Sequence, residues 1–154
     1  MDMETKQVIV VRHDLIKGSS AVRRGKMMAQ VAHASVASLM KLFTFEKITT
    51  LPGGILEPGQ EYNRIYTQFG SDTVLSDWLL GKFTKIVVSV PSEKELLELH
   101  DKLCKKEDDD FMPFALITDC GLTEFNGIPT NTCLGIGPYL SERIDKYTSN
   151  LPLL

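Results

Sequence analysis

The run QVIVVR, Gln7 to Arg12, decides the fold because it is a continuous apolar and β-branched segment. Such a run predicts a strand that is covered on both faces, as in the sheets of α/β proteins. Residues 24–43 then follow a helical period, and a second strand-like run occupies 84–90. A strand, a helix and another strand in this order predict parallel pairing through a right-handed crossover.

The second half of the chain continues this alternation. Residues 92–106 predict a helix that Ser92 caps, with acidic residues in the first turn and lysines in the last. Strands are expected at 113–119 and 130–138, and a short helix at 141–147. The connection between these two strands has no helical pattern, so we expect them to be antiparallel. The prediction is an α/β fold on a four-stranded mixed sheet, with three parallel strands and one antiparallel.

Residues 44–82 interrupt the alternation, since they show no sustained period. The Pro-Gly pairs at 52–53 and 58–59 indicate turns, a short hairpin is expected around 62–69, and a short helix at 73–81. A chain of 154 residues fits one domain. We therefore expect a single domain, 1–154, with an irregular insertion at about 44–82.

Composition narrows the classes of protein to consider. The net charge is −3, and no uninterrupted apolar run is long enough to span a membrane. The first residues are acidic and lead directly into a strand, which is atypical of a signal peptide. The three cysteines have neither paired nor metal-site spacing, so we expect reduced thiols and a cytoplasmic protein. Charge is uneven, because Lys17, Arg23, Arg24 and Lys26 form a basic cluster while 107–110 is acidic.

The helix segment GKMMAQVAHASVASLM, 25–40, carries polar side chains in a line. Lys26, Gln30 and His33 are spaced i, i+4, i+7 and so share one side of the helix. Apolar and small residues collect on roughly the opposite side, which we expect to face the core: Met28, Val31, Ala32, Ser35, Leu39 and Leu42.

Two polar segments are expected to meet beyond the carboxyl ends of the parallel strands, where α/β folds bind ligands. One leads into Lys26, in the first helical turn, and the other leaves a buried strand at Asp119. A carboxylate near that ammonium could orient or deprotonate a water, and Thr123 and Thr132 offer hydroxyls to hold it. The alternatives are a surface lysine and an aspartate that only accepts from loop N–H groups. Metal-ligand spacing is lacking, and so are the GxSxG, P-loop and GxGxxG motifs, so we expect no metal and no organic cofactor.

These motifs together resemble one family. The segments GKMMAQVAHA, TDCGLTE, TCLGIGP and ERIDKYTSNLPLL, with Arg12, Asp14 and Leu15 ahead of them, are similar to those of the type II peptidyl-tRNA hydrolases, the archaeal and eukaryotic class. The match covers about two thirds of the chain in the right order. The combination GK-x-x-AQ-x-AHA, D-x-G-x-T and GIGP is specific, although no single piece is.

The resemblance implies a three-layer α/β/α domain and hydrolysis of the ester between a peptide and the terminal ribose of tRNA. It places Lys26, Asp119, Thr123 and Thr132 in the catalytic centre. It implies that Gln30, His33 and Gly121 support the site and bind substrate. The expected partner is therefore peptidyl-tRNA, without a membrane. Family members often form dimers, so a homodimer is also to be considered.

The chain departs from the family pattern around the D-x-G-x-T segment. Leu122 and Glu124 stand where members carry a basic residue and a glutamine, and a residue is inserted in the following PGT. Losing a cation and gaining an anion weakens phosphate binding, for which Arg23 and Arg24 in the preceding loop could compensate. Two alternatives therefore stay open: a weakened member that binds tRNA or a protein, and a hydrolase of another acylated substrate.

Overall fold

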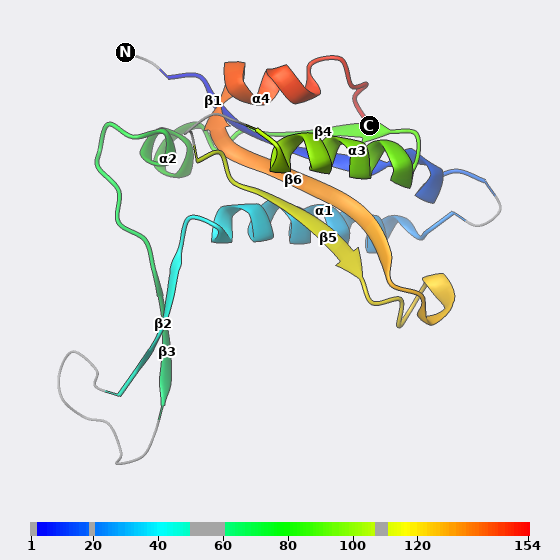
Figure 1. Ribbon diagram of the computed structural model, residues 1–154, viewed down its shortest axis with the longest axis horizontal. Helices are drawn as coiled ribbons and strands as arrows, with labels where there is room; N and C mark the ends of the chain where they lie inside the picture. Colours follow the sequence, from blue (N-terminus) through cyan, green and yellow to red (C-terminus); the bar gives the residue numbers. More distant parts are fainter. Residues whose placement is uncertain (1–2, 19–20, 50–60, 107–110) are drawn as a thin grey trace.

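A computed structural model describes residues 3–18, 21–49, 61–106 and 111–154 (Figure 1). The main sheet has the strand order β4-β1-β6-β5. Its strands are β1 (Thr5–Arg12), β4 (Lys85–Val90), β5 (Phe114–Asp119) and β6 (Thr130–Leu140). β1 pairs in parallel with β4 and antiparallel with β6, and β5 pairs antiparallel with β6.

The α/β class and the mixed four-stranded sheet are confirmed, and so is the antiparallel pairing of the two later strands. Among the described strands, β1 and β4 are directly paired in parallel, and the other two pairings in the main sheet are antiparallel. The physical reason is that β6 returns directly after β5 and takes the place beside β1. β5 is thereby an outer strand, and it ends at Asp119.

The central strand β1 is buried on both faces, as its sequence predicts. Ile9 and Val11 contribute to a cluster on one face with Met27 and Ala34 of helix α1 (Arg24–Met40). The other face carries a cluster to which Val8 and Val10, helix α3 (Glu93–Cys104) and helix α4 (Ser141–Thr148) contribute. In Figure 1, α1 runs along one side of the sheet, and α3 and α4 lie on the other. No helix in the described part of the chain is long and apolar enough to cross a bilayer.

Helix α1 lies very close to β6, and this close approach determines which of its faces is buried. A Cβ atom at Gly135 would collide with the backbone of Ala34 and crowd Ser38. Ser38 is fully buried, and its hydroxyl donates to the carbonyl of Gly137. Small side chains on α1 and a glycine on β6 therefore allow the helix and the strand to touch.

The predicted buried face of α1 is correct only in part, since Val31 packs against the cluster that contains Ile9 and Val11. The residues that the helix buries are Met27, Gln30, Ala34 and Ser38, whereas Met28 is 71% exposed and Ala32 is also exposed. The contact with β6 selects the Ala34–Ser38 stripe. The amide of Gln30 can be buried on this face because both its oxygen and its nitrogen are hydrogen-bonded.

We expect Gly135→Ala to destabilise the fold by about 1–3 kcal/mol, since the new methyl group must push α1 away from β6. Urea denaturation measures the free energy of unfolding. Gly25→Ala is the matched control, because a Cβ at Gly25, in the first turn of α1, meets nothing within 4 Å. Equal stabilities of the two variants would contradict the proposed close contact.

Residues 44–82 contain more regular structure than expected. β2 (Thr44–Ile48) and β3 (Tyr62–Tyr66) form an antiparallel hairpin that projects from the body in Figure 1. The strand at 62–66 was expected, but its partner is 44–48, so the hairpin begins earlier. The short helix is confirmed as α2 (Val74–Asp77), continued by a π-helical turn, η2 (Trp78–Lys82). The Pro-Gly pairs and the acidic run 107–110 lie outside the described residues.

Candidate active site

The end of β5 and the start of α1 bring an ammonium group and a carboxylate together. Lys26 lies in the first turn of α1, and Asp119 is the last residue of β5. The Nζ atom of Lys26 is 2.5 Å from Oδ2 of Asp119. The side chains are 19% and 9% exposed, so the pair is largely shielded from bulk water and yet reachable from the surface. The two polar segments therefore do meet in space.

Two further donors fix the carboxylate of Asp119. The amide of Gln30 donates to Oδ2 at 2.8 Å, and the backbone N–H of Gly121 donates to Oδ1 at 2.8 Å. Gly121 has a φ of +79°, and a Cβ there would collide with the backbone of Ile128. Glycine at this position thus lets the loop fold back and direct its N–H to the carboxylate.

The donors around Asp119 hold its pKa below the ordinary value. The hydrogen bond from Lys26 lowers the pKa most, and the Gly121 N–H, the Lys26 charge and the Gln30 amide lower it further, whereas burial opposes them. At neutral pH the side chain is therefore a carboxylate with two fixed oxygens. It is suited to accept a hydrogen bond from water and to face a cation.

Because the pKa of Asp119 is lower in the folded than in the unfolded chain, the ionised group stabilises the fold above the ordinary pKa of 3.8. This contribution is lost as the pH falls through the folded-state pKa. We expect acid unfolding of the wild type to show this dependence, measured by circular dichroism between pH 6 and about pH 2. Asp119→Asn removes it, while Asp101→Asn on the exposed face of α3 retains it. An identical acid profile for wild type and Asp119→Asn would contradict the shift.

The two threonines occupy different positions. Thr123 is exposed, and its hydroxyl accepts a hydrogen bond from Lys26 at 3.2 Å. Thr132 is fully buried at the start of β6, and its hydroxyl donates to the Gln30 oxygen at 2.7 Å. A chain of contacts therefore runs from Thr132 through Gln30 to Asp119 and Lys26.

The remaining candidates surround this centre without joining it. Arg23 donates to Glu124 at 2.7 Å, which links the loop before α1 to the loop after β5. Arg24 is exposed and lines an apolar groove with Met28 and Leu154 on another side of α1. His33 is exposed, one turn beyond Gln30.

Arg12 supports the same end of the sheet and had no role assigned from the sequence. Its guanidinium donates to both carboxylate oxygens of Asp14, at 3.1 and 2.7 Å, and to the Asn131 carbonyl at 2.9 Å. The side chain is 10% exposed, and Glu93 lies 3.5 Å away. These contacts tie the end of β1 to the start of β6, next to Thr132. The signal in the sequence is an arginine at the end of a buried strand.

The arrangement of the centre suits ester hydrolysis by water. An ionised carboxylate can orient a water molecule, and a neighbouring ammonium can stabilise the oxyanion that forms when water adds to a carbonyl. Among the described residues, no group of three or more histidines, cysteines and carboxylates is arranged to hold a metal ion.

Comparison with known proteins shows similarity to one family along nearly the whole chain. The profile of the family described as Peptidyl-tRNA hydrolase PTH2 matches residues 5–154. A peptidyl-tRNA hydrolase of Methanopyrus kandleri is 38% identical over 149 residues, which are 97% of each chain. That of Sulfurisphaera tokodaii is 35% identical over 99% of this chain and 100% of its own. That of Staphylothermus marinus is 34% identical over 98% and 96%.

The match spans nearly the whole chain, including both segments of the candidate site. The chain belongs to the PTH2 family of peptidyl-tRNA hydrolases.

Proposed function

We propose that this protein hydrolyses the ester bond of peptidyl-tRNA and releases free tRNA and peptide. The observation that carries the proposal is the 2.5 Å contact between Lys26 and Asp119 at the end of β5. Membership of the PTH2 family and the activity named for three full-length relatives support it. Because its substrate arises on ribosomes, we place the protein in the cytoplasm.

Lys26, Asp119 and Thr123 carry the chemistry in this proposal. The water oxygen bonds to the ester carbonyl carbon while Asp119 accepts a hydrogen bond from that water. The ammonium of Lys26 faces the developing oxyanion, or the ribose oxygen as it leaves. The C–O bond of the ester breaks, and the ribose oxygen takes up the proton that the water loses. Thr123, which already contacts Lys26, positions the water or the ammonium.

Gln30 and Thr132 act as positioning residues in the same proposal. Both residues are buried, so neither the Thr132 hydroxyl nor the Gln30 amide faces open solvent. Thr132 holds the oxygen of Gln30, which turns the amide nitrogen toward Asp119. Gly121 has an equivalent role from the other side of the carboxylate.

The fold details that we expect of the family belong to this proposal too. Apolar clusters on both sheet faces support a three-layer α/β/α arrangement. The pairings support three strands in one direction, β1, β4 and β5, with β6 opposed to them. A homodimer stays an expectation that sedimentation of the purified protein tests.

Release of the acylated amino acid from purified N-acetyl-aminoacyl-tRNA tests the proposed activity. We expect release by the wild type, with and without a chelator, and greatly reduced release by Asp119→Asn. Binding of tRNA without cleavage would instead indicate a weakened member of the family. Cleavage of a free peptide ester in preference to N-acetyl-aminoacyl-tRNA would indicate another acylated substrate.

The ion pair between Arg23 and Glu124 leads to a prediction for the KM of peptidyl-tRNA. Glu124 forms an ion pair with Arg23, a cation beside the centre. Glu124→Gln removes this ion pair, so Arg23 becomes available to bind a phosphate of the tRNA. We expect the KM for peptidyl-tRNA to fall about threefold or more, with a steeper dependence on salt. Replacing both Arg23 and Arg24 with alanine raises the KM and flattens that dependence. The measurement is steady-state kinetics from low to physiological salt, and Glu98→Gln on α3 is the control. An unchanged KM in Glu124→Gln would show that Arg23 does not meet the tRNA.

A further inference from the structure

The outer edge of β5 has no role in the chemistry proposed above. Within the described residues β5 pairs with β6 alone, so its other edge is free. A groove of about 670 Å³ lies beside it, lined by Ala32, His33, Val36 and Ala37 of α1 and by residues 116–118 of β5. We propose that this groove holds the peptide half of peptidyl-tRNA, an inference that rests on the proposed function.

The groove begins where the catalytic centre ends. Thr118 lines the groove, and the next residue is Asp119. On α1, Gln30 contacts Asp119, and the following turns of the helix form the groove wall. A substrate whose ester lies at Asp119 therefore has a continuous path from the reacting carbonyl along α1 and β5.

The chemistry of the lining favours peptide over nucleic acid. Among the described residues that line the groove, none is a lysine, arginine, aspartate or glutamate. Binding of tRNA depends on cations that neutralise phosphates, so this lining does not suit the tRNA half. Small and aliphatic side chains, with one imidazole and one hydroxyl, suit peptides of varied sequence. Arg23 and Arg24 lie at the start of α1, where the tRNA half would extend away from the groove.

The backbone of β5 can pair with an extended peptide. Gly137 donates to the carbonyl of Pro113 at 2.7 Å, so Pro113 faces β6. Backbone groups alternate along an antiparallel pair, which directs those of Phe114 and Leu116 to the free edge. Edge strands bind extended peptides in this way. Because the ester is at the carboxyl end of the peptide and Asp119 is at the carboxyl end of β5, the peptide would run parallel to β5.

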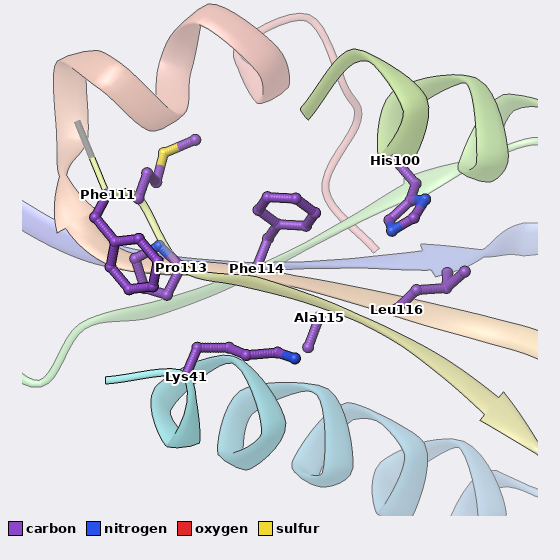
Figure 2. A pocket seen from close by; sticks show the side chains of 8 residues that line it. Lys41, His100, Phe111, Pro113, Phe114, Ala115 and Leu116 are labelled. Carbon is purple, nitrogen blue, oxygen red and sulfur yellow. The ribbon is translucent and has the colours of Figure 1, made fainter. Parts of the chain in front are cut away.

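The length of β5 limits how many peptide residues can pair with its free edge. A second groove, of about 460 Å³, lies at the start of β5. In Figure 2, Lys41 approaches the segment 114–116 from the α1 side and His100 approaches it from the α3 side. β5 has six residues, which span about 20 Å at roughly 3.3 Å per residue. The edge is thus long enough for about five or six peptide residues, starting at the ester.

Peptide length is the variable that tests this inference. We would measure kcat/KM for N-acetyl-alanyl-tRNA and for N-acetyl-pentaalanyl-tRNA, and take the ratio of long to short. We expect a ratio of about ten for the wild type, because only the longer peptide reaches the edge. Val36→Asp places a charge on an exposed groove residue, 58% exposed, and should bring the ratio to about one. Leu97→Asp, an equivalent change on α3 at 38% exposure, should keep the wild-type ratio.

A second measurement reports on backbone pairing. An uncleavable, amide-linked pentaalanyl-tRNA should slow hydrogen exchange at the amides of Phe114 and Leu116, whereas an amide-linked alanyl-tRNA should not. Equal ratios for wild type and Val36→Asp, or no protection of these amides, would overturn the inference while leaving the activity established. No release from either substrate would contradict the proposed function itself, and the groove with it. Val36→Asp could instead dissociate a dimer and leave the ratio of kcat/KM values unchanged. That result would assign the edge of β5 to contact with a second copy of the chain and would also overturn the inference.

Discussion

Lys26→Ala is expected to lower the turnover of peptidyl-tRNA by about 100-fold or more, the usual effect of removing an oxyanion donor. The ammonium is 2.5 Å from Asp119 and contacts Thr123, so its removal leaves the carboxylate without this ion pair. Arg23 is paired with Glu124, and Arg24 lines a groove on another side of α1. Steady-state kinetics with N-acetyl-aminoacyl-tRNA measure the loss, which should fall mainly on kcat.

The fold should survive this replacement. Asp119 keeps its hydrogen bonds from Gln30 and Gly121, and loss of one partner costs about 1–3 kcal/mol of a typical 5–15 kcal/mol. The pKa of Asp119 should rise in the variant, because the Lys26 contact lowers it most in the wild type. The acidic limb of the activity profile then moves to higher pH. Lys102→Ala on α3 is the control, and wild-type turnover in Lys26→Ala would remove Lys26 from the chemistry.

Asp119→Asn is expected to lower turnover by about 10²–10⁴-fold, the range for loss of a positioned acid–base group. The amide keeps the shape of the side chain, but it no longer carries the charge that orients water and faces Lys26. The loss should again fall on kcat. This variant should not raise the KM for tRNA, since it removes a negative charge from beside a polyanion. Asp101→Asn is the matched control.

The double variant tests whether these two residues act as one unit. Side chains in direct contact give non-additive losses, so Lys26→Ala combined with Asp119→Asn should cost much less than the product of the single effects. Fully multiplicative losses would mean that the ammonium and the carboxylate act independently, and would contradict the mechanism proposed.

Local sequence patterns determined the elements of this fold. The run at Gln7 to Arg12 was readable as a strand buried on both faces because apolar β-branched residues need cover on each side. Ser92 was readable as a helix cap, and its side chain accepts from the N–H of Lys94. The meeting of Lys26 and Asp119 was also predictable, since each lies at an element end that the order of strands and helices places at one edge.

Tertiary packing decided what the sequence left open. The buried face of α1 depends on Gly135 in β6. Because Gly135 has no side chain, Ala34 and Ser38 can approach the strand closely. Helical period alone could not identify this contact, because small residues fit either face. The burial of Gln30 also depends on distant residues, since its partners Thr132 and Asp119 come from β6 and β5. The free edge of β5 likewise follows from β6 taking the position beside β1. Periodicity within a segment reflects local geometry, whereas the neighbours of a face are set by residues far away in the chain.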